Sequence, residues 1–190
     1  EPTAATVLNV TQDHLDWHGS MDAYAKAKAR IFSMTELCIV NRDDALVMAM
    51  VENLHNMHVR SFGRDVPMYA GDVGIETSHD VSWLVASQAN EFEDEVMPAP
   101  KRKKGAPPPE RQPGRLVRLM PVEALAIRGM HNALNFQVSA QLAIAAGASW
   151  GPALRAARDY VGEPHRMEFV RSIHGIDFFN DSKGTNVGFS

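Results

Sequence analysis

The sequence has a single cysteine, no long hydrophobic run and no excess of positive charge. Cys38 is the one cysteine in 190 residues, so no internal disulfide can form, and a reducing cytosol is the compartment we expect. No stretch approaches the roughly 18 consecutive apolar residues of a membrane span. The formal net charge is -4, which argues against nucleic acid and anionic membranes as partners.

Several sequence signatures of catalysis are also missing. The chain contains no G-x-x-x-x-G-K-[ST] phosphate loop, no nucleophile elbow and no zinc signature. His55 and His58 lie three apart, but no cysteine or carboxylate is spaced with them, and we expect both to be exposed. Apolar residues are plentiful, because 45% of the chain is hydrophobic, and this is enough for one good core.

Strand-like and helix-like patterns alternate along the first 62 residues. Ser20 can cap a helix over Met21–Thr35, and Asp43 or Asp44 can cap a second that ends near Leu54. Short apolar segments predict buried strands at 4–10, 37–40 and 59–62. The βαβαβ order indicates an α/β fold, a mainly parallel sheet flanked by helices.

The pattern then changes to a small antiparallel part followed by more helices. Residues Asn90–Arg115 carry an acidic patch, a basic patch and several prolines, which predicts a flexible surface insertion. Asn132 can cap a long helix that ends at Gly147. The remaining expectations are a hairpin of strands 73–77 and 81–86, a strand 116–120, a helix 150–160, and strands 167–173 and 176–179.

The first candidates for chemistry lie at and after the opening strand. Asp13 and His14 follow it, where a neutral imidazole can bind a divalent ion and a carboxylate can hold a cation; a capping or loop-tying role is the alternative. Lys28 projects into the centre of the apolar stripe of its helix, which is formed by Met21, Tyr24, Ile31 and Phe32. It either lays its stem on the core with its ammonium in water, or is held neutral by burial and takes up carbon dioxide as a carbamate that binds magnesium.

Two further polar clusters occur later in the chain. Asn132 and Asn135 lie on one face of their helix, and their amides suit an adenine edge, although Asn132 could equally be an N-cap. The segment Asn180–Asn186 follows a strand and holds a lysine, a glycine and a hydroxyl. Such a turn can bind a phosphate or carboxylate, but short Ser/Lys/Gly loops are common.

Taken together, these segments resemble the muramyl ligases, and among them the branch that adds D-glutamate. The resemblance is carried in family order by Leu8–Phe32, Ile39–Ala45, Gly129–Asn135, Gly162–Val170 and Phe178–Asn186. It implies an ATP-dependent ligase of peptidoglycan precursor synthesis, which forms an acyl phosphate on UDP-N-acetylmuramoyl-L-alanine and passes it to D-glutamate. It also implies a cytoplasmic monomer that uses ATP and Mg²⁺.

The resemblance further implies a role for particular residues. Lys28 resembles the carbamylated lysine, and His14 resembles a magnesium ligand. The nucleotide-contacting positions are Asn132, Asn135, Arg166 and Asp181. Asp13, Lys183 and Thr185 are expected near the incoming amino acid and the phosphoryl group.

The chain departs from the family pattern in what it omits. In the family a phosphate loop lies upstream and a further domain lies downstream, so we expect residues 1–186 to be an N-terminally truncated central ATP-binding domain. Residues 187–190 would begin the link to the next domain, and the chain alone would not turn over. A related ligase, such as one that extends folate with glutamate, and a non-catalytic nucleotide-binding module are the alternatives.

Overall fold

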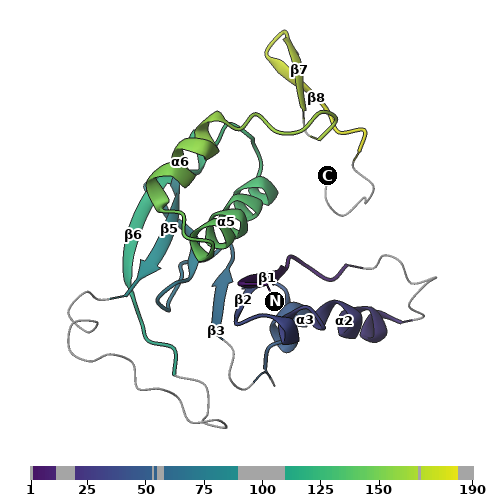
Figure 1. Ribbon diagram of the computed structural model, residues 1–190. Coiled ribbons are helices and arrows are strands. Elements are labelled where there is room, and N and C mark those ends of the chain that lie inside the picture. The colour runs from purple at the N-terminus through teal and green to yellow at the C-terminus, as the bar shows by residue number, and fades with distance from the viewer. Residues whose placement is uncertain are drawn as a thin grey trace.

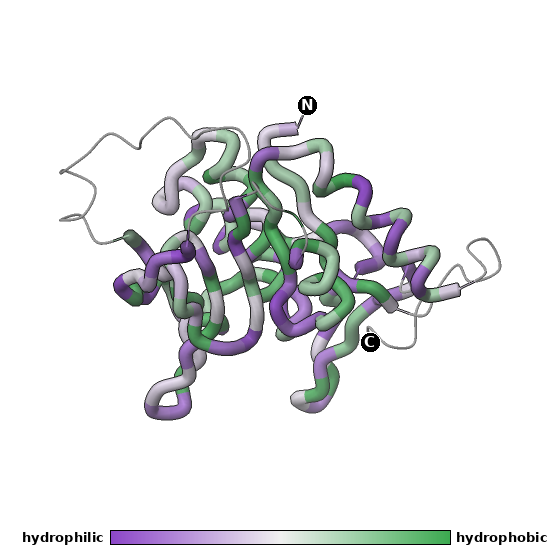
Figure 2. Tube along the Cα trace, turned by 90° about the horizontal axis from the view of Figure 1, so that it is seen from below, coloured by the Kyte–Doolittle hydropathy of each residue, from purple (hydrophilic) through white to green (hydrophobic). Residues whose placement is uncertain are grey.

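The computed structural model describes residues 2–11, 20–52, 54, 58–89, 110–166 and 168–183. The chain forms a parallel sheet, an antiparallel sheet and a separate hairpin, with helices on both faces of the parallel sheet (Figure 1). This mixed architecture confirms the predicted α/β class. Hydrophobic segments run through the interior of the molecule (Figure 2).

The parallel sheet contains three strands in the order of the sequence. They are β1 (Ala4–Val7), β2 (Leu37–Asn41) and β3 (His58–Phe62). β1 pairs in parallel with β2, and β2 pairs in parallel with β3. The predicted βαβαβ unit is therefore confirmed, with α2 (Met21–Ala29) and α3 (Ala45–Ala49) as its helices.

Both helices begin where predicted but end earlier. Ser20 caps α2, because its Oγ accepts a hydrogen bond from the Ala23 amide at 3.2 Å. α2 ends at Ala29, and a 3-10 turn, η1 (Phe32–Met34), follows. This tighter turn buries Phe32 completely and leaves Ile31 40% exposed, so the prediction that Ile31 belongs to the buried stripe is wrong.

Asp44, rather than Asp43, caps α3. Its Oδ1 accepts hydrogen bonds from the Leu46 amide at 2.9 Å and the Val47 amide at 3.1 Å. The helix ends at Ala49 and not near Leu54, because Met50 and Val51 continue as turns.

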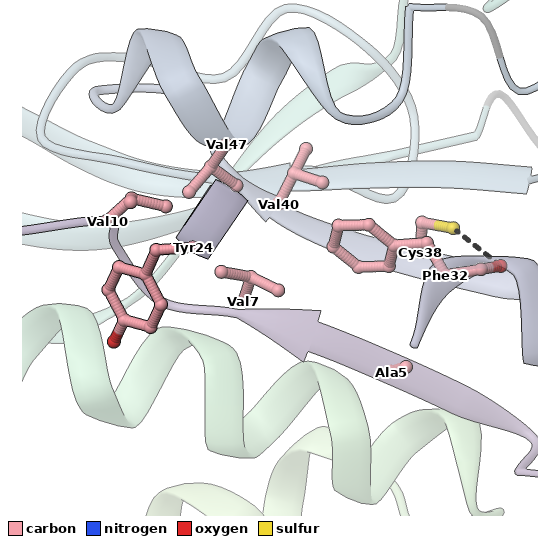
Figure 3. Close-up of a cluster of buried hydrophobic side chains, with 8 residues drawn as sticks. All are labelled: Ala5, Val7, Val10, Tyr24, Phe32, Cys38, Val40 and Val47. Carbon is pink, nitrogen blue, oxygen red and sulfur yellow. Dashed lines mark hydrogen bonds between the residues drawn. The ribbon is translucent and has the colours of Figure 1, made fainter. Parts of the chain in front are cut away.

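One face of the parallel sheet is covered by α2, η1 and α3. Eight buried residues meet there, and Figure 3 shows them: Ala5, Val7, Val10, Tyr24, Phe32, Cys38, Val40 and Val47. The thiol of Cys38 points at the Phe32 carbonyl, with Sγ and O 4.0 Å apart. Burial raises the pKa of Cys38 to about 11, so the thiol stays protonated at neutral pH, as expected for an inert core cysteine.

The opposite face of this sheet is covered by α5 (Met130–Ala145). Ile39 points to this side because side chains alternate along a strand, and it packs with Phe62 and Val138. Two buried glutamines of α5 also bond to the backbone at the end of β3. Gln137 donates to the Gly63 carbonyl and accepts from the Gly63 amide, both at 3.1 Å, and Gln141 donates to the Ser61 carbonyl at 2.9 Å.

The antiparallel sheet contains β4 (Val73–Ser78), β5 (Val81–Gln88) and β6 (Arg115–Pro121). β4 and β5 form the predicted hairpin, and β6 pairs with β5. The sheet packs against α5 and α6 (Trp150–Asp159) through the apolar residues Ile75, Leu84, Met120, Leu125, Ala133 and Ala157. α5 thus lies between the two sheets and contacts both.

The end of the predicted insertion is part of the folded body. The Ala70 amide donates to the Gln112 carbonyl at 2.9 Å, and Arg111 pairs with the buried carboxylate of Asp72 and lies 4.7 Å from the Tyr69 ring centroid. Residues 90–109 lie outside the described chain. Residues 110–115 of the predicted insertion therefore belong to the described fold, although the prediction placed the boundary at Arg115.

Asn132 is not the N-cap of its helix, which corrects that interpretation. α5 starts at Met130 after Gly129, whose φ of 102° suits glycine. Asn132 is the third helical residue, and its Nδ2 donates to the Arg128 carbonyl at 2.7 Å. At the other end Gly147, with φ 97°, terminates the helix as predicted.

The C-terminal hairpin projects from the rest of the molecule (Figure 1). It consists of β7 (Glu168–Ile173) and β8 (Ile176–Asn180), joined at His174 and Gly175, which both have positive φ. Large apolar side chains on it are exposed, among them Phe169 at 56% and Ile176 at 63%. Among the helices that the structure describes, none is both long and apolar enough to cross a bilayer.

Candidate functional site

A cavity of about 720 Å³ lies between α5, α6 and the segment that leaves α6. The two helices pack side by side, and the chain after α6 turns at Gly162, with φ 91°, where it lines the cavity. Its lining residues are Leu125, Ile127, Asn132, Asn135, Phe136, Ser139, Ala140, Ala143, Ala153, Ala156, Ala157, Tyr160, Gly162, Glu163 and Arg166.

Three of the predicted nucleotide-contacting residues meet at this cavity. Asn132 and Asn135 lie one turn apart on α5, so both amides face the same side. Arg166 reaches the cavity from the segment after α6. The nearer asparagine and the arginine are 31 positions apart in sequence, and it is the packing of α5 on α6 that brings their side chains to one place.

The walls of the cavity are mostly apolar. Phe136 contributes an aromatic ring from α5, Ile127 a branched side chain from the preceding loop, and the alanines of both helices leave the space open. A cavity with apolar walls and a few convergent polar groups suits a flat heterocycle, whose edge needs amides and whose faces need apolar contact.

Polar groups that the sequence did not single out stand at the rim. The hydroxyl of Tyr160 donates to the Glu163 carboxylate at 3.1 Å. The pKa of Tyr160 is raised, first by partial desolvation of its hydroxyl and then by Glu163, while Arg166 opposes the shift. Glu163 belongs to the segment that carries the family resemblance, which was the available signal, whereas nothing in the pattern marked Tyr160 or Phe136.

Asp181 and Lys183 lie in the turn after β8 and do not line the cavity. The Ser182 amide donates to the side-chain oxygen of Asn180 at 3.1 Å, which shapes the turn. The Lys183 amide donates to the His165 carbonyl at 3.1 Å. The turn is therefore joined to the segment that carries Arg166, although Lys183 itself is exposed and Asp181 half-buried.

Lys28 projects inward from α2, as the sequence indicated. Its Nζ donates to the Asn9 carbonyl at 3.1 Å and lies 4.5 Å from the ring centroid of Tyr24. Lys26, on the other face, is exposed and pairs with Asp22 at 2.6 Å. The contact with the ring face suits an ammonium, while the bond to Asn9 suits either an ammonium or the N–H of a carbamate.

The chain leaving β1 is held by side chains from three elements. Lys28 binds the Asn9 carbonyl, the Asn41 amide donates to the Leu8 carbonyl at 2.8 Å, and the Asp44 carboxylate accepts from the Val10 amide at 2.8 Å. This segment leads toward Asp13 and His14.

Three of the predicted site residues, Asp13, His14 and Thr185, lie outside the described residues. Within the described parts of the chain, no group of three or more His, Cys, Asp or Glu side chains could hold a metal ion. Of the two histidines expected to be exposed, His58 is exposed at the start of β3, and His55 is not described.

Comparison with known proteins identifies the family. The Mur ligase middle domain matches residues 1–98 of this chain. The chain belongs to the Mur ligase family. This confirms the resemblance drawn from the sequence, and solved Mur ligases share its fold. MurF from Acinetobacter baumannii aligns with a TM-score of 0.59 and 22% identity over 95% of this chain and 34% of that one. MurC from Thermotoga maritima aligns with a TM-score of 0.56 and 19% identity over the same shares, 95% and 34%.

Sequence relatives within the Mur ligases are closer. A UDP-N-acetylmuramoylalanine–D-glutamate ligase of Bordetella pertussis is 63% identical over 187 residues, which are 98% of this chain and 36% of that protein. A protein of the same name from a Polaromonas species is 49% identical over 197 residues, or 99% of this chain and 32% of that protein. The chain therefore spans about a third of the length of these curated relatives.

Proposed function

We propose that the full-length protein is an ATP-dependent ligase that joins D-glutamate to UDP-N-acetylmuramoyl-L-alanine. Support comes above all from the 63% identity over 98% of the chain with a ligase of that name. The cavity adds support, because it gathers Asn132, Asn135 and Arg166, three positions at which the resemblance places nucleotide contacts.

The cavity between α5 and α6 is the proposed site for the adenine end of ATP. Asn132 already gives one N–H to the Arg128 carbonyl, so its amide oxygen is the group available to accept from an exocyclic amine. Asn135, one turn further along, can donate and accept at the same edge. The guanidinium of Arg166 supplies positive charge at the rim, where ribose and phosphates would leave the cavity.

The proposed reaction proceeds in two transfers. The carboxylate oxygen of UDP-N-acetylmuramoyl-L-alanine attacks the γ-phosphorus of ATP, forming an acyl phosphate and releasing ADP. The amine of D-glutamate then attacks the acyl carbon, loses a proton, and the tetrahedral intermediate expels inorganic phosphate to leave the amide. Such chemistry depends on positioning and on stabilising negative charge rather than on a nucleophilic side chain. We assign Asp181 to the nucleotide, and Asp13, Lys183 and Thr185 to the neighbourhood of the incoming amino acid and the phosphoryl group.

His14 and a carbamate on Lys28 are the proposed holders of Mg²⁺, which would neutralise charge on the phosphoryl oxygens. The position of Lys28 fits this role in two respects. Its Nζ is held beside Asn9 at the exit of β1, on the segment that continues to His14, and its bond to Asn9 is one that a carbamate N–H also makes. The contact with the Tyr24 ring would be given up when the carbamate forms.

Amino-acid-dependent release of ADP by the full-length protein tests the reaction. We expect release with UDP-N-acetylmuramoyl-L-alanine and D-glutamate, and none when L-glutamate or a diamino acid replaces D-glutamate. Release with a diamino acid instead would assign the protein to a sister ligase. No ADP release with any acceptor, together with retained nucleotide binding, would identify a non-catalytic module.

Two lysine substitutions on one helix test the metal site. Lys28→Arg keeps a positive charge but cannot form a carbamate, so we expect the rate to fall by roughly 10²-fold or more. Lys26→Arg is the matched control, because Lys26 is exposed on the opposite face of α2, and its activity should equal that of the wild type. A Lys28→Arg enzyme with wild-type activity would remove the carbamate from the proposal.

A further inference from the structure

The segment that carries Arg166 and the turn that carries Asp181 are tied together by a set of hydrogen bonds, here called the clasp. The clasp comprises His165, Glu168, Asn180, Ser182 and Lys183. Apart from the exposed Lys183, its members were not assigned to the site. Neither Glu168 nor Asn180 lines the cavity.

Glu168 is the anchor of the clasp. Its Oε2 accepts from the His165 amide at 2.9 Å and from the side-chain amide of Asn180 at 3.4 Å. His165 has φ 67°, a left-handed conformation that costs a non-glycine residue about 1 kcal/mol or more. The bond from its amide to Glu168 stabilises that conformation, which sets the direction in which the chain enters Arg166.

Asn180 connects the same segment to the turn after β8. Its Nδ2 donates to Nδ1 of His165 at 2.8 Å, while its Oδ1 accepts from the Ser182 amide at 3.1 Å. Because an amide nitrogen only donates, Nδ1 of His165 must accept, and the imidazole carries its proton on Nε2. In the flipped orientation, the side-chain oxygen of Asn180 would face the Glu168 carboxylate, and its NH₂ group would face the Ser182 N–H. Both contacts would be repulsive, so the orientation is unambiguous.

We propose that Glu168 and Asn180 are positioning residues that hold Arg166 at the cavity and the Asp181–Lys183 turn in fixed relation to it. The backbone bond from Lys183 to the His165 carbonyl at 3.1 Å closes the link from the other side. The nucleotide contact of Arg166 and the phosphoryl contacts of the turn would then be set by one rigid unit. This inference rests on the proposed function, since it is the nucleotide contact of Arg166 that the clasp would adjust.

A double-mutant cycle in the full-length protein tests the proposal, with ADP as the ligand and calorimetry as the measurement. Arg166→Ala should weaken ADP binding by about ten- to a hundredfold, the worth of a charge-assisted hydrogen bond. Glu168→Ala should weaken it by about five- to tenfold when Arg166 is present. In the Arg166→Ala background the same change should have a smaller effect, less than about threefold, because Glu168 can then act only through the turn that carries Asp181.

Two further variants separate positioning from general loss of structure. Glu168→Gln keeps an acceptor for the His165 amide, and should bind ADP within about threefold of the wild type. Asp177→Asn is the matched control for loss of charge, because Asp177 lies exposed on β8 and outside the clasp, and its affinity should not change. If Glu168→Ala unfolds the protein, the ADP affinities of Glu168→Gln and Asn180→Asp still test the positioning role. Asn180→Asp should bind ADP more weakly than Glu168→Gln, because the aspartate loses the donor to His165 and repels Glu168.

The outcomes are distinct. Any of three results would overturn the positioning role. The first is that Glu168→Ala lowers ADP affinity equally in both backgrounds, and the second is that Glu168→Gln binds ADP as weakly as Glu168→Ala. The third is that Asn180→Asp binds ADP with wild-type affinity. A wild-type protein that does not bind ADP would overturn the proposed function itself, and the inference with it.

Discussion

Replacing Gln137 by leucine should destabilise the junction between α5 and the parallel sheet. Gln137 is 2% exposed, and its side-chain amide makes two hydrogen bonds of 3.1 Å with the backbone of Gly63, one to the N–H and one to the C=O. The Gln137 side chain thus pairs with the N–H and C=O groups just after β3 in the way that the backbone of a neighbouring strand would. Leucine has a similar volume but offers neither bond.

The expected cost follows from the two buried groups left without partners. An unsatisfied buried donor or acceptor costs about 1–3 kcal/mol, so the pair costs about 2–6 kcal/mol. Burying additional apolar surface of leucine offsets part of this. We therefore expect Gln137→Leu to lower the free energy of unfolding of the full-length protein by about 2–4 kcal/mol, measured by urea titration with the transition of this domain followed separately.

Hydrogen exchange gives a local measure of the same effect. The Gly63 amide is protected in the wild type by Gln137, and we expect its exchange to accelerate in the variant before other amides of β3 change. Gln112→Leu is the matched control, because Gln112 is exposed and its substitution should change stability by less than about 0.5 kcal/mol. Unaltered protection of Gly63 together with an unaltered unfolding midpoint would show that the two bonds do not contribute.

Three other substitutions or conditions have definite expected results. Asp44→Ala removes the cap of α3 and the bond to the Val10 amide, and should lower the free energy of unfolding by about 2 kcal/mol in the same urea titration. A loss below about 0.5 kcal/mol would contradict the assignment of Asp44 as the helix cap. Cys38, with its pKa raised to about 11 by burial, should resist iodoacetamide at pH 8 until the protein unfolds. Because the Cys38 thiol ionises near pH 9 in the unfolded chain, the free energy of unfolding should fall by about 2–3 kcal/mol as pH rises from 9 to 11. This fall should come on top of any fall that the Cys38→Ala variant shows over the same pH range. Arg118, bonded to Glu76 at 2.6 Å, lowers the pKa of that carboxyl, so Arg118→Gln should raise it in an NMR titration, and a constant value would refute the pairing.

Much of the fold followed from local patterns. The alternation of short apolar segments with helical ones predicts the parallel sheet, because a parallel connection requires a crossover and the intervening helices supply it. Ser20, Asp44 and Gly147 mark helix ends through chemistry that involves only a few neighbouring residues. Helix C-termini were less predictable, since α2 and α3 stop where packing of Phe32 and the turn at Met50 outweigh a favourable sequence.

The candidate site also has a part that the sequence predicted and a part that depends on the tertiary structure. The sequence alone predicted Asn132, Asn135 and Arg166 as nucleotide-contacting residues, because they lie in short segments that resemble the family in the same order. It also determined that Lys28 faces inward, since helical periodicity is a local property. Only the tertiary structure decided that the asparagines and the arginine share a cavity. It also decided that the side chain of Gln137 hydrogen-bonds to the backbone of Gly63, 74 positions away. Contacts between distant segments depend on how whole helices and sheets pack, and neither residue periodicity nor turn chemistry specifies that packing.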